Sequence, residues 1–174
     1  MKALRALSGG IDRLTDAVGA GLRWLALLLV AVGVINVIGR YLGAQLGMQL
    51  SSNALLEAQL QAFSVIFLLG ASYLLRHDGH IRVDIINSHL GARLRAWIDL
   101  LGTLFFLIPF CLAMLFFGTD YVLRAWSRLE LSPNPGGLPL YPIKTVILIA
   151  FALLLLQAIS HLIKSADQLR GDPS

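Results

Sequence analysis

One uncharged run decides the fold: residues Trp24–Gly39 read WLALLLVAVGVINVIG. Extended to about Leu42, the run approaches the ~20 apolar residues that a helix needs to cross about 30 Å of hydrocarbon. Three further runs of this kind follow along the chain. The sequence therefore predicts four membrane spans, at residues 22–42, 58–75, 98–119 and 141–162.

The composition places the whole chain in the membrane class. Hydrophobic residues make up 57% of the sequence and charged residues 14%, and the mean hydropathy is +0.75, values well outside the range of soluble domains. Lipid offers no partner to backbone N–H and C=O groups, and no alternating pattern favours barrel strands, so the spans are expected to be helices. An all-α integral membrane protein with one membrane domain, residues 1–174, is the prediction.

Two segments outside the spans are amphipathic. Residues Leu4, Leu7, Ile11, Leu14 and Val18 recur at helical spacing with charges between them. We expect a short helix along the inner membrane surface there, with a disordered basic tail as the alternative. Since this segment is about 23 residues long and carries acids, it favours a retained first span over a signal peptide. A second amphipathic segment, residues 81–97, is expected to lie at the membrane interface or to lead obliquely into the third span.

The basic residues predict the orientation of the chain. The two terminal segments and the middle connection hold 10 Lys and Arg residues, whereas the first and third connections hold 4. Basic residues accumulate in cytoplasmic segments, so both termini and the middle connection are expected inside. This topology also explains the net charge of +4, which therefore gives no support to nucleic-acid binding.

The residues that an enzyme or a redox carrier would need are scarce. Cys111 is the only cysteine, which excludes paired-thiol chemistry, and we expect it to be a packing residue. The histidines lie at connections and span ends, which disfavours haem ligation inside a bundle. No ionisable residue is expected near the bilayer midplane, where a substrate path would place one. Arg40 and Glu57 lie near the outer boundary, and either a pair across the first connection or two separately solvated charges is expected.

The connection after the third span is rich in proline and glycine and is expected to be a fairly rigid exposed loop. Exposed loops are where a partner can dock. The residues proposed for this contact are Asn134, Pro135, Gly136, Gly137, Leu138, Pro139 and Tyr141.

A family resemblance rests on these motifs. The second span ends in LGASYLLR, residues 69–76, and is followed by GHIRVD, residues 79–84, and later by NPGGLP, residues 134–139. Over nearly the whole chain this pattern resembles the DctQ-type small membrane subunit of a tripartite ATP-independent periplasmic (TRAP) transporter. The resemblance implies structural or assembly roles, without catalysis, for Gly79, His80, Arg82, Val83 and Asp84.

The resemblance also implies a setting. A small subunit of this family would lie in the bacterial inner membrane beside a large multispanning subunit and would help to receive a periplasmic substrate-binding protein. It would act as a scaffold in sodium-driven uptake of an organic acid, with no enzymatic activity and no cofactor. Two other classes stay open from the residues alone: a self-sufficient small exporter, and a membrane anchor subunit of a redox complex.

Overall fold

The chain folds into long helices joined by short connections. The computed structural model describes residues 2–48, 52–77 and 91–169. The elements are α1 (Lys2–Leu46), α2 (Asn53–Arg76), α4 (Ala92–Gly102), the π-helical turn η1 (Thr103–Leu107), α5 (Ile108–Ser127) and α6 (Tyr141–Leu169). Four helical stretches, Ala3–Leu46, Asn53–Arg76, Arg93–Ser127 and Tyr141–Leu169, are long and apolar enough to cross a membrane. The prediction of an all-α membrane protein with four spans is confirmed.

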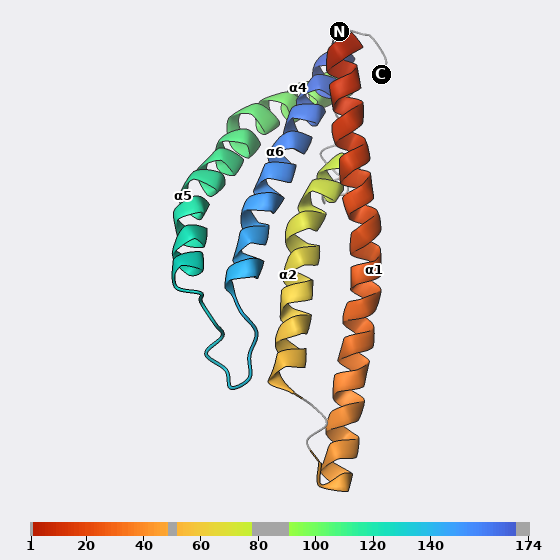
Figure 1. Cartoon of the computed structure of the whole chain (residues 1–174). Coiled ribbons are helices and arrows are strands. Elements are labelled where there is room, and N and C mark those ends of the chain that lie inside the picture. The colour runs from red at the N-terminus through yellow and green to blue at the C-terminus, as the bar shows by residue number, and fades with distance from the viewer. Residues whose placement is uncertain (1, 49–51, 78–90, 170–174) are drawn as a thin grey trace.

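Helix α6 is the central element of the bundle. It contacts α1, α2, α4 and α5, and Figure 1 shows it between α5 on one side and α2 on the other. The small apolar core lies against it and comprises Leu75, Cys111, Leu154 and Ala158. Cys111 is fully buried there, in the packing position expected for it. Large apolar side chains elsewhere point outward, as Phe106 and Phe116 of η1 and α5 do, which suits helices surrounded by lipid or by another membrane subunit.

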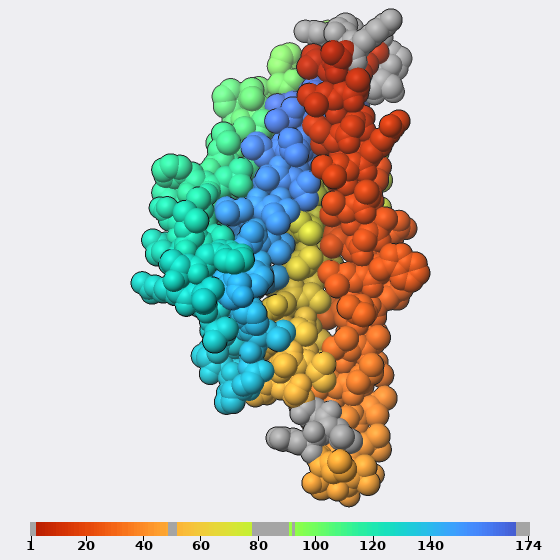
Figure 2. All heavy atoms as spheres, in the orientation of Figure 1, coloured from red at the N-terminus to blue at the C-terminus, as the bar shows by residue number. Residues whose placement is uncertain are grey.

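Helix α1 is much longer than its expected span. Its 45 residues correspond to about 68 Å at 1.5 Å per residue, more than twice the hydrocarbon thickness. Its C-terminal end extends beyond the start of α2 and beyond the loop that follows α5, as the ribbon and the space-filling view both show (Figures 1 and 2). The N-terminal segment is therefore helical, as expected, but it continues into the first span and is not a separate surface helix.

The burial of this N-terminal segment also differs from the expectation. Leu4 and Leu7, which belong to the predicted apolar stripe, are 52% and 53% exposed, whereas Asp12 and Thr15, farther along the helix, are 7% and 1% exposed. The polar side of the helix faces the bundle because it finds hydrogen-bond partners on α6, described below. Of the predicted apolar stripe, Ile11 is buried, whereas Leu4, Leu7 and Leu14 face the surroundings.

Helices α4 and α5 are continuous through η1 and together form one bent helix. Pro109 has no N–H to give to the preceding turn, and the turn before it widens into the π-helical η1, where the N–H of Ile108 bonds to the carbonyl of Thr103. Figure 1 shows α4 running obliquely across the end of the bundle before the chain turns into α5. This agrees with the oblique entry expected for the third span, although residues 81–90 of the predicted amphipathic segment lie outside the described residues.

Candidate functional site

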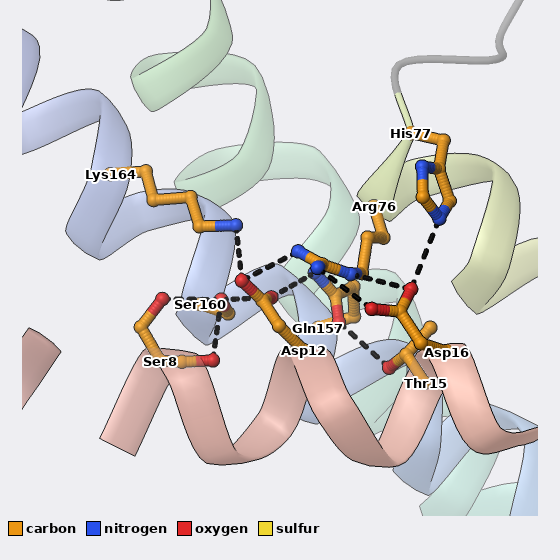
Figure 3. A network of polar contacts seen from close by, with 9 residues as sticks. All are labelled: Ser8, Asp12, Thr15, Asp16, Arg76, His77, Gln157, Ser160 and Lys164. Atoms are coloured by element: carbon orange, nitrogen blue, oxygen red, sulfur yellow. Dashed lines mark hydrogen bonds and ion pairs between the residues drawn. The ribbon is translucent and has the colours of Figure 1, made fainter. Parts of the chain in front are cut away.

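A polar network joins the N-terminal part of α1 to the ends of α2 and α6 (Figure 3). At its centre is the carboxylate of Asp12, whose Oδ2 lies 2.6 Å from Nη1 of Arg76 and 2.5 Å from Nζ of Lys164. Arg76 belongs to α2 and Lys164 to α6, so the single carboxylate of Asp12 on α1 binds both other helices. Removing one partner from such a poorly solvated cluster would leave a charge without compensation.

The same arginine binds a second carboxylate one turn along α1. Nε and Nη2 of Arg76 each donate to one oxygen of Asp16, both at 2.8 Å. The ring of His77 lies 3.1 Å from Asp16 through Nε2 and packs against Tyr73, with 4.4 Å between the ring centroids. A planar guanidinium is suited to this task, because its fork can serve two carboxylates at once in fixed geometry.

Neutral hydrogen bonds complete the network on the side of α6. Gln157 accepts from the hydroxyl of Thr15 at 2.8 Å and donates from Nε2 to Asp12 at 3.1 Å. The hydroxyl of Ser160 donates to Asp12 at 2.9 Å and lies 2.7 Å from that of Ser8. Gln157, Thr15 and Ser160 are almost completely buried. Asp12 thus receives four hydrogen bonds or ion pairs, which offset the cost of removing its carboxylate from water.

The local sequence explains why these groups meet. Ser8, Asp12 and Thr15 on α1 follow each other at four- and three-residue spacing, so they share one face of the helix. The residues Gln157, Ser160 and Lys164 on α6 repeat that spacing. Two helices with matching polar stripes can pair all of their buried groups only in one register. The network therefore fixes how α1 and α6 are aligned.

A second polar cluster lies at the opposite ends of the helices. Glu57, in the second turn of α2, accepts from Nδ2 of Asn134 at 2.8 Å and from the backbone N–H of Leu138 at 2.6 Å, and it also accepts from the hydroxyl of Ser132. All three donors belong to the loop between α5 and α6. We call this arrangement the Glu57 clamp.

The loop is itself ordered by short-range bonds. The N–H of Ser132 bonds to the carbonyl of Leu138 at 3.2 Å, and that of Leu140 to the carbonyl of Glu130 at 2.9 Å, so the loop closes as a narrow hairpin. Gly137 lies directly against the clamp: a Cβ there would be 2.7 Å from both Glu57 carboxylate oxygens. Only glycine fits at this position, and the close approach lets the carboxylate reach into the loop.

Two further bonds tie this loop to α2. Asn53 donates to the carbonyl of Pro135 and Gln61 to that of Pro139, each at 3.1 Å. The proposed docking loop is therefore a fixed surface built on the first turns of α2. The prediction that it is fairly rigid agrees with these contacts; the docking role stays a prediction.

Of the other predicted site residues, the structure describes some and not others. Gly79, His80, Arg82, Val83 and Asp84 lie outside the described residues, so their assembly role stays a prediction. Glu57 and Arg40 are both described, and no ion pair joins them in this part of the chain. Glu57 is instead occupied by the loop, because donors from Ser132, Asn134 and Leu138 surround it.

The network around Asp12 is not among the predictions from the sequence. The charges between the apolar residues of the N-terminal segment, which include Asp12 and Asp16, are expected there on a short surface helix. Arg76 and Lys164 count there among the basic residues that predict the topology, and Arg76 also belongs to the family motif. The usable signal was the spacing: two acids four residues apart in front of a span, and polar residues at three- and four-residue spacing at the end of another. In a membrane protein such stripes indicate helix contacts.

The polar network around Asp12 is suited to a structural role, that of holding helices together. Its carboxylates, cations and amides are paired with one another, and within residues 2–48, 52–77 and 91–169 no group of three His, Cys, Asp or Glu side chains is placed to hold a metal ion. The observed pairing favours helix alignment over proton transfer or nucleophilic attack.

Comparison with known proteins agrees with the architecture. The profile of the family described as tripartite ATP-independent periplasmic transporters, DctQ component, matches residues 29–168. No curated protein and no solved structure matches the chain. The match covers most of the 174 residues, including the second span, the clamped loop and the polar stripe of α6. The chain belongs to the DctQ family and is the small membrane component of a TRAP transporter.

Proposed function

We propose that this chain is a brace: it holds the large membrane subunit of its transporter in place and helps to dock a periplasmic substrate-binding protein during sodium-driven uptake of an organic acid. Membership of the DctQ family shows that the chain is a component of a TRAP transporter. The proposal adds four points to this: the bracing role, the docking role, the coupling ion and the class of substrate. The bacterial inner membrane is the location that goes with it.

The observation that carries the proposal is the self-pairing of the charges. Asp12 and Asp16 balance the charges of Arg76 and Lys164 at one end of the bundle, and Glu57 is saturated by its own loop at the other. A carrier needs polar groups left available for a substrate or an ion along its path. Here the charged groups of the two clusters hold helices and the loop together, and the outward faces of α1 and α5 are apolar, which is the behaviour of a scaffold.

The proposed topology places the two clusters on different sides of the membrane. By the distribution of basic residues, the inner network lies at the cytoplasmic ends of the helices, and the clamped loop faces the periplasm. A rigid loop on that side is suitably located to meet a soluble periplasmic protein.

An assembly experiment tests the bracing role. The large subunit, carrying an affinity tag, is expressed with and without this chain, and the yield and thermal stability of the purified large subunit are compared. The expected result is stoichiometric co-purification and a higher melting temperature when the chain is present. A large subunit of equal yield, equal melting temperature and equal uptake in the absence of this chain would contradict the proposal.

A matched pair of variants sharpens the test. Asp12→Asn breaks the network at its most connected residue, whereas Asp120→Asn changes an exposed carboxylate on α5. Co-purification should fall for Asp12→Asn and stay at the wild-type level for Asp120→Asn, because only the first loosens the alignment of three helices. Equal yields for the two variants would show that the network has no part in bracing.

A further inference from the structure

We propose that the periplasmic partner is recognised at a patch beside the clamped loop, and that it presents carboxylates around an apolar centre. The patch consists of five residues at the end of α5 and the start of the loop: Arg124, Trp126, Arg128, Leu129 and Leu131. The inference rests on the proposed docking function and goes beyond it, since it moves the contact from the Pro-Gly segment to these residues and assigns the chemistry of the partner.

The apolar part of the patch is exposed on a rigid base. Trp126, Leu129 and Leu131 are 47%, 61% and 65% exposed. The indole is nevertheless fixed, because its Nε1 donates to the hydroxyl of Thr145 at 2.8 Å and its ring packs edge-on against Tyr141 at 4.6 Å. Aromatic and arginine side chains on a fixed base are the usual composition of the most important contacts in an interface.

The backbone at Leu129 is held in an uncommon conformation. Its φ is 45°, in the left-handed region, where a residue with a Cβ is disfavoured. Two bonds hold the chain there, from the N–H of Leu129 to Trp126 and from that of Glu130 to Ala125, at 3.1 and 3.0 Å. The turn directs a leucine outward where asparagine or glycine would relieve the strain. A contact between this side chain and a partner would offset the strain of the backbone.

Within the part of the chain that the structure describes, the charges of the patch are not neutralised. The carboxylate of Glu130 is bonded to Lys144, and that of Glu57 to the loop. Arg124 and Arg128 form no ion pair with any other described residue. Their position at the C-terminal end of α5 is favourable for the helix dipole. Arg124 and Arg128 are four positions apart, so they lie on one side of the end of α5. Two guanidinium groups without a carboxylate partner among the described residues fit a surface that carries carboxylates.

Binding-protein titration in liposomes tests the patch. The complete membrane complex is reconstituted, and substrate uptake is measured as the concentration of the binding protein is raised. The double variant R124E/R128E should raise the half-maximal concentration about tenfold or more, with less change at saturation. The matched control is Arg40→Glu, an exposed arginine on α1 outside the patch, which should leave the titration unchanged. The milder R124Q/R128Q should give an intermediate shift.

Several outcomes decide the matter. A titration unchanged by R124E/R128E, in a complex that still requires the binding protein, would overturn the patch and leave the docking function standing. Wild-type uptake that needs no binding protein would overturn both. A shift seen only in liposomes with anionic lipid, and absent with phosphatidylcholine alone, would mean that the arginines bind lipid headgroups, and would overturn the patch as well. A shift of equal size in both lipid compositions supports it.

Discussion

Arg76 and Asp16 form a two-point ion pair between α2 and α1, with Nε and Nη2 each 2.8 Å from a carboxylate oxygen. Through Nη1 the same guanidinium holds Asp12 at 2.6 Å. One side chain therefore links two turns of α1, and through Asp12 it is connected with Lys164 of α6. The alignment of the helices at this end of the bundle depends on this three-helix arrangement.

The two acids of the network should respond unequally to neutralisation. Asp12→Asn leaves Lys164 and Arg76 facing a neutral amide, whereas the carboxylate of Asp16 is 42% exposed and water can replace much of its interaction. We expect Asp12→Asn to cost about 3–5 kcal/mol and Asp16→Asn about 1 kcal/mol. Thermal unfolding of the purified variants measures the difference. Equal losses of stability would show that burial does not distinguish the two acids.

Two glycines of α1 make a matched pair of tests for helix packing. A Cβ at Gly19 would lie 2.2 Å from Cδ2 of Tyr73, whereas one at Gly21 would meet nothing within 4 Å. Gly19→Ala should therefore push α1 from α2 and lower the melting temperature. Gly21→Ala should be neutral or stabilising by up to about 1 kcal/mol, because alanine favours helix.

A second-site change checks the cause in that experiment. Tyr73→Ala removes the ring that an alanine at position 19 would meet. If the clash is the reason for the loss, the double variant should lose less stability than the sum of the two single variants. Additive losses, or a Gly19→Ala variant as stable as Gly21→Ala, would contradict the packing described here.

The Glu57 clamp predicts a sensitive position in the outer loop. Gly137→Ala would place a methyl group 2.7 Å from both carboxylate oxygens, so the carboxylate must leave and the loop loses three bonds. We expect faster proteolysis of the loop and a stability loss of about 2–4 kcal/mol. The control Gly70→Ala, in α2 with nothing within 4 Å, should leave proteolysis at the wild-type rate. Protection of the loop in Gly137→Ala would mean that the clamp does not order it.

The proposed topology is tested by accessibility from the two sides. Cysteines placed at Arg13 and Pro133, both exposed, should react with a membrane-impermeant maleimide from opposite sides of the membrane, the first from the cytoplasm and the second from the periplasm. Cys111 is fully buried and should not contribute to the signal. Labelling of both positions from one side would refute the N-in, C-in arrangement.

The sequence was enough for the class of fold, and the reason is physical. A run such as Trp24–Gly39 in lipid has to pair its backbone groups internally, so length and apolarity specify a helix with little ambiguity. The bend in the third span also has a local cause, because Pro109 has no N–H to give to the preceding turn. What the pattern of α1 did not specify was its surroundings. An apolar stripe faces the core in water but can face lipid in a membrane, so Leu4 and Leu7 point outward while Asp12 points in.

The contacts between distant segments were beyond sequence reasoning. Glu57 and Asn134 are 77 positions apart, and Asp12 and Ser160 are 148 apart, so no local spacing connects them. For Glu57 the nearest opposite charge in the sequence, Arg40, was the natural partner to expect. The loop was the actual one because three neutral donors in a closed hairpin satisfy a carboxylate without a second charge.

The central claim is that this chain serves transport through assembly and carries no substrate itself. Uptake into liposomes is its most direct test. Three preparations are compared under an inward sodium gradient: this chain alone, the complete membrane complex, and the complex with substrate-loaded binding protein. The account predicts organic-acid uptake only in the third preparation, and its loss when this chain is omitted. Sodium-driven uptake by this chain alone, or full uptake without it, would contradict the account.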